Sequence, residues 1–139
     1  TVIFRYFNVY GNRQPVRGQY APVIGIFLRQ LAAGEPLTIV GDGEQRRDFV
    51  NVLDICRANI MAAISNPDDD AYGQVYNVGT GINYSVNQIA EMFNTETKYI
   101  PARKGEARIS LANTEKIYNT FAWRPQVNLE KWIENKING

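Results

Sequence analysis

Arginine is the residue type in this chain best suited to bind a charged ligand, and it recurs beside glycine or at the end of an expected strand. The residues concerned are Arg13 and Arg17 in GNRQPVRG, Arg46 and Arg47 after Gly-Asp-Gly, and Arg103 and Arg108 around Gly105. A guanidinium group binds the oxygens of a phosphate or carboxylate through paired N–H donors, and glycine lets the backbone approach an anion closely. The pattern favours phosphate recognition. The alternative interpretation is that each arginine only solvates the surface.

The distribution of charge supports the first interpretation. Residues 1–34 contain four arginines and no acid, and the first lysine is Lys98. Arginine without lysine suits planar, bidentate contacts better than general solubility. The net charge is only +1 and the pI is near 7.7, so bulk electrostatics give no reason to expect a nucleic acid partner.

Other chemistries find little support. The chain has no histidine, which excludes histidine-based catalysis, and a single cysteine, which excludes a disulfide framework and a cysteine-based zinc site. The interior carboxylate pairs, Asp42 with Glu44 and Asp48 with Asp54, lie near turns or beside arginine, so we expect them to cap or to form ion pairs. We therefore predict no catalytic residue and no metal site.

Two further features favour structural roles. Cys56 belongs to an apolar helical stripe with Leu53, Ile60 and Ile64, and we expect it to pack in the core. The segment Gly79-Thr80-Gly81 lacks the third glycine of a dinucleotide-binding loop, so we interpret it as a tight turn.

The elements that must position these residues fit one domain, because 139 residues with 45% hydrophobic and 21% charged content are typical of a single globular unit. We expect strands at residues 2–7, 37–40, 47–52, 74–78 and 98–100. We expect helices at residues 20–33, 53–65, 85–93, 114–121 and 129–137, with a capping box at Ser85 and Gln88. The fold class is therefore mixed α/β, with a small sheet and about five helices. No stretch is long enough to span a membrane and no signal peptide is recognisable, so we expect a cytoplasmic protein.

The first strand raises a question about partners. Residues 2–7 are apolar on both faces, as in a parallel sheet, yet no neighbouring strand is obvious from the sequence. An unpaired apolar edge recruits another chain, so this orphan strand predicts a homo-oligomer in which it pairs between subunits.

The order of several motifs identifies a family resemblance. RYFNVYG followed by NRQ is very similar to the segment that leaves the Rossmann domain in extended short-chain dehydrogenase/reductases, the NAD-dependent nucleotide-sugar epimerases and dehydratases. The similarity continues through YAPVIGIF, PLTIVGDGEQRRDFVNVLDICRAN, VYNVGTG, ARKGEARIS and WRP, and covers most of the chain. It is greatest to the UDP-hexose and UDP-N-acetylglucosamine 4-epimerases.

The resemblance implies a UDP-sugar ligand and a set of contacts. Asn8 would bind near the diphosphate, Gln19 and Tyr20 would lie against the diphosphate and uracil, and Thr38 and Val40 would flank the base. Arg47 and Arg108 would clamp the diphosphate, with Arg103 close by, and Phe7 would lie on the nicotinamide side. Ser110 replaces a tyrosine of some 4-epimerases, so the resemblance does not specify the sugar.

The family's catalytic residues are a Gly-rich loop, a Ser/Thr and a Tyr-x-x-x-Lys pair, and this chain has none of them: no tyrosine stands four residues before any of its lysines. The resemblance therefore implies a substrate-binding domain of residues 1–139 with one leading Rossmann-type strand, no NAD site of its own and no activity alone. The alternative hypotheses are a stand-alone module that oligomerises, and an excerpt of a longer enzyme.

Overall fold

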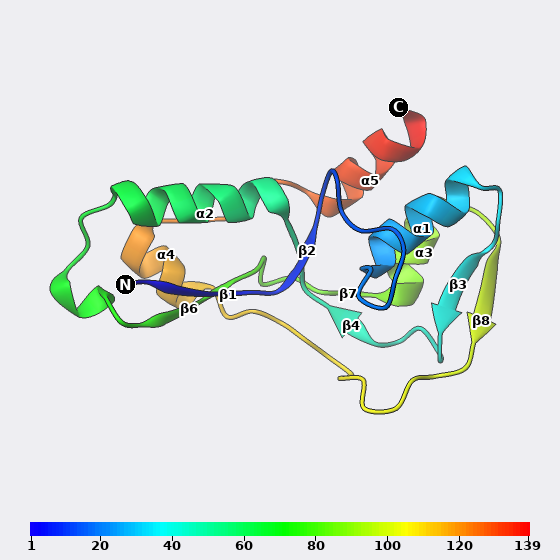
Figure 1. Cartoon of the computed structure of the whole chain (residues 1–139), viewed down its shortest axis with the longest axis horizontal. Coiled ribbons are helices and arrows are strands. Elements are labelled where there is room, and N and C mark those ends of the chain that lie inside the picture. The colour runs from blue at the N-terminus through cyan, green and yellow to red at the C-terminus, as the bar shows by residue number, and fades with distance from the viewer.

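The chain is elongated, and its helices gather at the two ends of the long axis (Figure 1). The structure, a computed structural model, describes residues 1–139. The helices are α1 (Val23–Ala32), α2 (Val52–Ile64), α3 (Val86–Phe93), α4 (Glu115–Phe121) and α5 (Leu129–Asn138), with a short 3-10 turn η1 (Asp69–Ala71). The strands are β1 (Ile3–Tyr6), β2 (Asn8–Tyr10), β3 (Leu37–Val40), β4 (Arg46–Arg47), β5 (Phe49–Asn51), β6 (Val75–Val78), β7 (Tyr84–Ser85) and β8 (Thr97–Ile100).

The strands form four separate two-stranded sheets, and each sheet joins segments that are distant in sequence. β1 pairs with β6, β2 with β5 and β3 with β8, all in parallel, whereas β4 and β7 are antiparallel. The mixed α/β class with five helices is thus the predicted one. The first strand is not an orphan within the chain, because β6 provides one neighbour, with Phe4 opposite Tyr76.

The lobe that contains both β1 and β6 has its own hydrophobic core. α2 and α4 bury Tyr76 and Val78 of β6, together with Phe121 and Trp123. Phe4 contacts Tyr76 and Phe121 edge-on, each at 6.3 Å between ring centroids. These aromatic contacts fix α4 against the same sheet face that α2 covers.

The opposite face of this sheet is largely uncovered. Side chains alternate between the two faces of a strand, so Ile3 and Arg5 of β1 point away from Phe4. Ile3 is 46% exposed and its neighbour Val75 is 37% exposed, although residues 2–7 were expected to be buried on both faces. That expectation was wrong for the chain by itself, because a parallel sheet with helices on only one face leaves the other in solvent.

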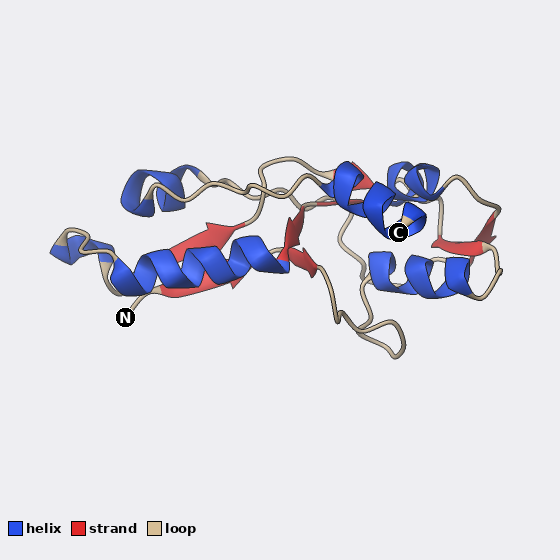
Figure 2. Cartoon of the chain, turned by 90° about the horizontal axis from the view of Figure 1, so that it is seen from above, coloured by secondary structure: helices blue, strands red, loops and turns tan.

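The second lobe packs α1, α3 and α5 around β3 (Figure 2). Ile24, Ile89 and Ile133 contribute one fully buried isoleucine from each helix. The predicted capping box is present: the Ser85 hydroxyl accepts from the Gln88 N–H, and the Gln88 side chain accepts from the Ser85 N–H. This cap fixes the start of α3 beside β7.

Helix α2 differs from its prediction in the face that it buries. The sequence stripe of Leu53, Cys56, Ile60 and Ile64 is exposed, and the buried positions are Asp54, Ile55 and Ala58. The expected core position of Cys56 was therefore wrong. A helix with apolar residues around most of its circumference does not reveal from sequence which stripe meets the sheet.

No helix of the structure combines the length and apolar character that crossing a membrane would require.

Candidate functional site: an arginine-lined cleft

Three adjoining cavities contain all eight residues predicted to bind the ligand. The largest, about 460 Å³, is lined by Asn8, Gln19, Tyr20 and Arg47 among others. A second of about 240 Å³ is bordered by Val40, Arg103 and Arg108, and a third of about 160 Å³ by Thr38, Val40 and Arg103. The residues come from β2, β3, β4, the loop before α1 and the loop 101–108, so only the folded chain brings them together.

Gln45 and Glu106 border all three cavities, and the sequence reasoning identified neither. Gln45 is buried and donates from Nε2 to the Val40 carbonyl at 3.0 Å, which fixes the wall between the cavities. Glu106 is the one acid in the basic segment PARKGEAR, and that isolated charge is the signal that could have found it.

Arg47 is held in place from two sides. Its NH1 group donates to the Arg46 carbonyl at 2.9 Å, and NH2 pairs with Glu106 Oε1 at 3.3 Å. The side chain of Arg47 is only 15% exposed, whereas that of Glu106 is 40% exposed. A guanidinium fixed at a cavity wall is pre-organised to accept an anion.

Arg108 forms a two-bond ion pair with Asp42. NH1 donates to Oδ1 at 2.9 Å and NH2 donates to Oδ2 at 2.7 Å. The Arg108 guanidinium, aided by the Glu44 N–H, lowers the pKa of the Asp42 carboxyl from 3.8 to about 2. Asp42 therefore acts in an ion pair, as expected from its position. Arg103 takes part in none of the structure's three ion pairs, so its charge is free of an acidic partner.

Thr38 on one wall of the cleft is held by side-chain hydrogen bonds, whereas Gln19 and Tyr20 on another wall lie in a loop. Thr38 is fixed by the side chain of Gln30, which donates to the Thr38 hydroxyl at 2.9 Å and accepts from the Thr38 N–H at 3.1 Å. The helix expected over residues 20–33 begins only at Val23, because Pro22 occupies the cap. Gln19 and Tyr20 therefore lie in the loop before α1, and Tyr20 is 90% exposed.

The remaining arginines do not converge on the cleft. Arg46 donates to the side chain and the carbonyl of Asn83 at 2.9 and 3.0 Å, and so joins β4 to the loop before β7. Arg13 and Arg17 lie exposed in the first loop and line none of the three cavities. The phosphate hypothesis thus narrows to Arg47, Arg103 and Arg108.

The Gly79-Thr80-Gly81 turn is already bound by a carboxylate of the chain. Asp48 accepts hydrogen bonds from the Thr80 and Gly81 N–H groups at 2.8 and 2.9 Å. These amides are therefore not available to a dinucleotide pyrophosphate, and the interpretation of this segment as a structural turn is confirmed. Phe7 follows β1 and lines none of the three cavities.

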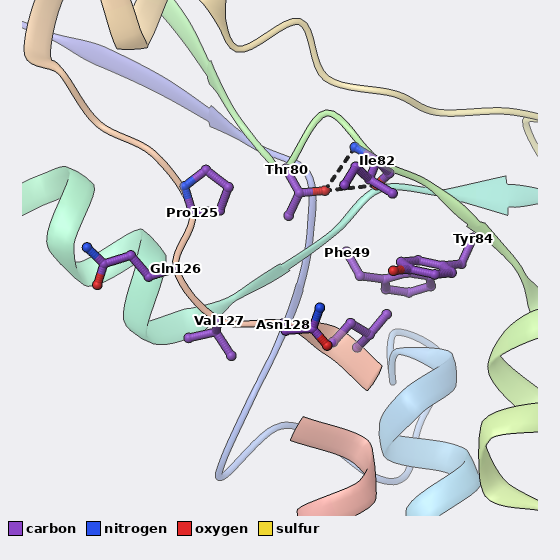
Figure 3. A pocket seen from close by; sticks show the side chains of 9 residues that line it. Phe49, Thr80, Ile82, Tyr84, Pro125, Gln126, Val127 and Asn128 are labelled. Atoms are coloured by element: carbon purple, nitrogen blue, oxygen red, sulfur yellow. Dashed lines mark hydrogen bonds between the residues drawn. The ribbon is translucent and has the colours of Figure 1, made fainter. Parts of the chain in front are cut away.

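A separate cavity of about 210 Å³ lies between β5, the loop after β6 and the segment that enters α5 (Figure 3). No charged residue lines it. The Thr80 hydroxyl, one of its polar groups, is already used within the protein: it accepts from the Ile82 N–H at 3.1 Å and donates its proton to Asp48 Oδ1 at 2.7 Å. This cavity therefore offers no cation to an anionic ligand.

The arginine-lined cleft presents cationic side chains that can bind an anion. Its carboxylates, Asp42 and Glu106, are both paired with arginine. The geometry therefore supports recognition of a phosphate-bearing ligand.

Comparisons with known proteins point to one family. The family model described as "NAD dependent epimerase/dehydratase family" matches residues 1–79. A putative UDP-glucose 4-epimerase of Methanocaldococcus jannaschii is 34% identical over 98% of this chain and 44% of that relative. The chain thus spans less than half the length of the curated relative and matches its C-terminal half.

Solved structures agree in fold and extent. The UDP-glucose 4-epimerase of Thermotoga maritima, determined with UDP-glucose, superposes with a TM-score of 0.87 at 36% identity, covering 99% of this chain and 44% of that one. The UDP-N-acetylglucosamine 4-epimerase of Methanobrevibacter ruminantium, in complex with UDP-N-acetylmuramic acid, superposes with a TM-score of 0.87 at 33% identity and the same coverage, 99% and 44%.

Proposed function

Since the chain belongs to the NAD dependent epimerase/dehydratase family, we propose that it is the substrate-binding domain of a nucleotide-sugar 4-epimerase or dehydratase. The ligand is a UDP-sugar, bound in the arginine-lined cleft. The observation that carries the proposal is the convergence of Arg47, Arg103 and Arg108 on adjoining cavities. A diphosphate needs this kind of multidentate cation cluster.

The ligand would cross the cleft with its diphosphate at the arginines. Thr38 and Val40 would flank the uracil, with Gln19 and Tyr20 beside it, and Asn8 would bind near the diphosphate. Their positions on the cavity walls support this arrangement. Uridine and diphosphate would therefore be recognised by different walls of the cleft.

The proposal assigns binding but no chemistry to this chain. NAD supplies hydride transfer in the family, and the glycine turn of this chain would not hold it, because Asp48 already binds the amides of that turn. Phe7 would face the nicotinamide from outside the cleft. The chain by itself would therefore bind UDP weakly and show no epimerase activity.

Isothermal titration with UDP tests the proposal. We expect binding by the wild-type chain, and loss of the binding heat in Arg47→Ala and Arg108→Ala. Arg29→Ala, which removes an arginine of α1 outside the three cavities, is the matched control and should bind as the wild type does. No detectable heat from the wild-type chain at millimolar UDP would refute the proposed site.

A second candidate function rests on the other lobe. Ile3 and Val75 are exposed on the uncovered face of the β1–β6 sheet, and each strand has a free edge. Ile60 and Ile64 add apolar surface on α2, 57% and 78% exposed. A two-stranded sheet with free outer edges and an exposed apolar face favours association with another chain, so the alternative is an interaction module that forms a homo-oligomer through its first strand.

Sedimentation velocity separates this alternative from a monomeric domain. If the chain forms a homo-oligomer, its sedimentation coefficient should rise toward that of a dimer as the concentration increases. Ile3→Lys, on the uncovered sheet face, should abolish this rise. Glu91→Lys, which changes an exposed residue on the other lobe, is the control and should sediment as the wild type does. A monomer at every concentration would refute the oligomer.

A further inference from the structure

The segment 108–110 lies beside β4 and begins with Arg108, which borders the cleft. The Arg46 N–H donates to the Arg108 carbonyl at 2.8 Å, and the Ser110 N–H donates to the Arg46 carbonyl at 2.9 Å. These two bonds form a single parallel bridge. The other residue of β4 is Arg47, which lines the largest cavity of the cleft. Two arginines of the proposed site therefore lie on neighbouring backbone segments.

A single bridge specifies its register weakly, because only two backbone hydrogen bonds oppose a shift. Side chains alternate between the two sides of an extended segment, so a shift by one residue would turn Arg108 away from the cleft. β4 has only two residues, and longer backbone pairing is not available to it. Side-chain contacts must therefore fix where the segment 108–110 lies along β4.

Asn83, the residue before β7, makes such contacts with both segments. Its Oδ1 accepts from Arg46 Nε at 2.9 Å, and its backbone carbonyl accepts from Arg46 NH2 at 3.0 Å. Its Nδ2 donates to the Ser110 carbonyl at 3.3 Å. The asparagine is half-buried and lines none of the three cavities of the cleft. Its side chain thus joins β4 to the segment 108–110 without bordering the ligand site.

Two other side chains hold the chain on either side of this bridge. Arg108 binds Asp42 through its own guanidinium, and the Asp48 carboxylate accepts from the Ala112 N–H at 3.1 Å. Neither of these contacts includes the side chain of Arg46. The side chain of Asn83 is therefore the one that connects β4 to the segment 108–110 through both of its polar atoms.

We propose that Asn83 is a positioning residue that fixes the register of the segment 108–110 on β4. That register sets the spacing between Arg47 and Arg108. This inference rests on the proposed diphosphate site. Two guanidinium groups hold a diphosphate together only when their spacing matches it, whereas a single phosphate needs only one of them. Asn83 thus sets the preference of the cleft for a diphosphate over a monophosphate.

Isothermal titration with UDP and with UMP tests this role in Asn83→Ala. The variant loses two side-chain hydrogen bonds, so we expect it to bind UDP about fivefold more weakly than the wild type and UMP within about twofold. A role in stability alone would weaken both nucleotides by the same factor. The matched control is Asn59→Ala, which also removes two side-chain hydrogen bonds but lies on α2 in the other lobe. It should bind both nucleotides as the wild type does.

Asn83→Asp separates folding from positioning, and it decides the question if Asn83→Ala does not fold. The variant keeps an acceptor for Arg46 but has no donor for the Ser110 carbonyl. We expect its thermal midpoint to stay near that of the wild type, while UDP binds about threefold more weakly and UMP is unaffected.

Three results would overturn the inference while the proposed function stands. They are unchanged UDP binding in the folded variants, an equal loss of UDP and UMP binding, and a wild-type chain that binds UDP but not UMP. No UDP binding by the wild-type chain would overturn both the inference and the proposed function.

Discussion

Asp48 binds both the backbone and the side chain of Thr80. Its Oδ1 accepts from the Thr80 N–H at 2.8 Å and from the Thr80 hydroxyl at 2.7 Å. Oδ2 accepts from the N–H groups of Gly81 and Ala112 at 2.9 and 3.1 Å. Asp48 is fully buried, so these four bonds replace its water shell and join three distant segments.

The first prediction concerns this buried carboxylate. Asp48→Asn replaces one acceptor oxygen by an NH2 group that faces N–H donors. We expect the free energy of unfolding in urea to fall by about 3 kcal/mol. Asp68→Asn, in an exposed loop, is the control and should stay within about 0.5 kcal/mol of the wild type. Equal effects at the two positions would contradict the assigned role.

The second prediction concerns pH and Asp42. Arg108 lowers the pKa of Asp42 from 3.8 to about 2 in the folded chain, so the pair stabilises the fold above about pH 3.8 and loses its effect as the pH falls toward 2. Thermal midpoints of the wild type and Asp42→Asn should differ slightly at neutral pH and converge near pH 2. The difference is small because both side chains are more than half exposed. A difference that persists at pH 2 would contradict the ion pair.

The third prediction concerns Tyr10. Burial raises the pKa of Tyr10 to about 12, although Asn51 close to the hydroxyl opposes this rise; no partner of good hydrogen-bond geometry meets the hydroxyl. Because the folded pKa lies above the unfolded value of 10.0, the titration of this phenol leaves the stability of the fold unchanged below pH 10 and lowers it as the pH rises from 10 toward 12.

Tyr10→Phe should therefore equal or exceed the wild type in stability at pH 7, by up to about 1 kcal/mol. Between pH 10 and 12 the free energy of unfolding of the wild type should fall by an amount on the order of 2 kcal/mol, and Tyr10→Phe should not show this fall. Urea unfolding at several pH values measures both effects. Tyr20→Phe, which changes an exposed tyrosine, is the control and should behave as the wild type does. If Tyr10→Phe and the wild type lost the same stability between pH 10 and 12, the raised pKa of Tyr10 would be refuted.

The fourth prediction tests which face of α2 is buried. Ile55→Ala should lower the free energy of unfolding by about 2–4 kcal/mol, because Ile55 is buried in the core of the first lobe. Ile60→Ala should cost less than about 0.5 kcal/mol, because Ile60 is more than half exposed. The thiol of Cys56 should react with a thiol reagent in the folded protein. If Ile60→Ala lowered the free energy of unfolding more than Ile55→Ala does, the buried face of α2 would be the one that the sequence predicted.

Local patterns in the sequence were sufficient for the type of most elements. Short β-branched runs predicted β3 and β6, and the Ser85–Gln88 capping box predicted the start of α3, because these signals act between residues close in sequence. The strand β2 (Asn8–Tyr10) was not predicted as a separate element, since its pairing with β5 depends on a segment some 40 residues away.

The sequence likewise predicted some features of the candidate site, and only the tertiary structure showed the others. The arginines and the motif order, including Arg47 and Arg108, indicated a phosphate ligand and the family from sequence alone. The partners of these arginines did not follow from it: Glu106 lies 59 residues from Arg47 in sequence, and Asp42 lies 66 residues from Arg108.

The sequence by itself determined which residue types are present, where helices and strands form, and which family the motifs belong to. Tertiary structure alone decided which face of α2 is buried, that β6 pairs with β1, and that Gln45 and Glu106 connect three cavities. Helix and strand signals act over a few residues, whereas burial and ion pairing depend on which distant surfaces meet. The exposed face of β1–β6 is the clearest case: its apolar sequence predicts burial, but only a neighbouring surface could provide it.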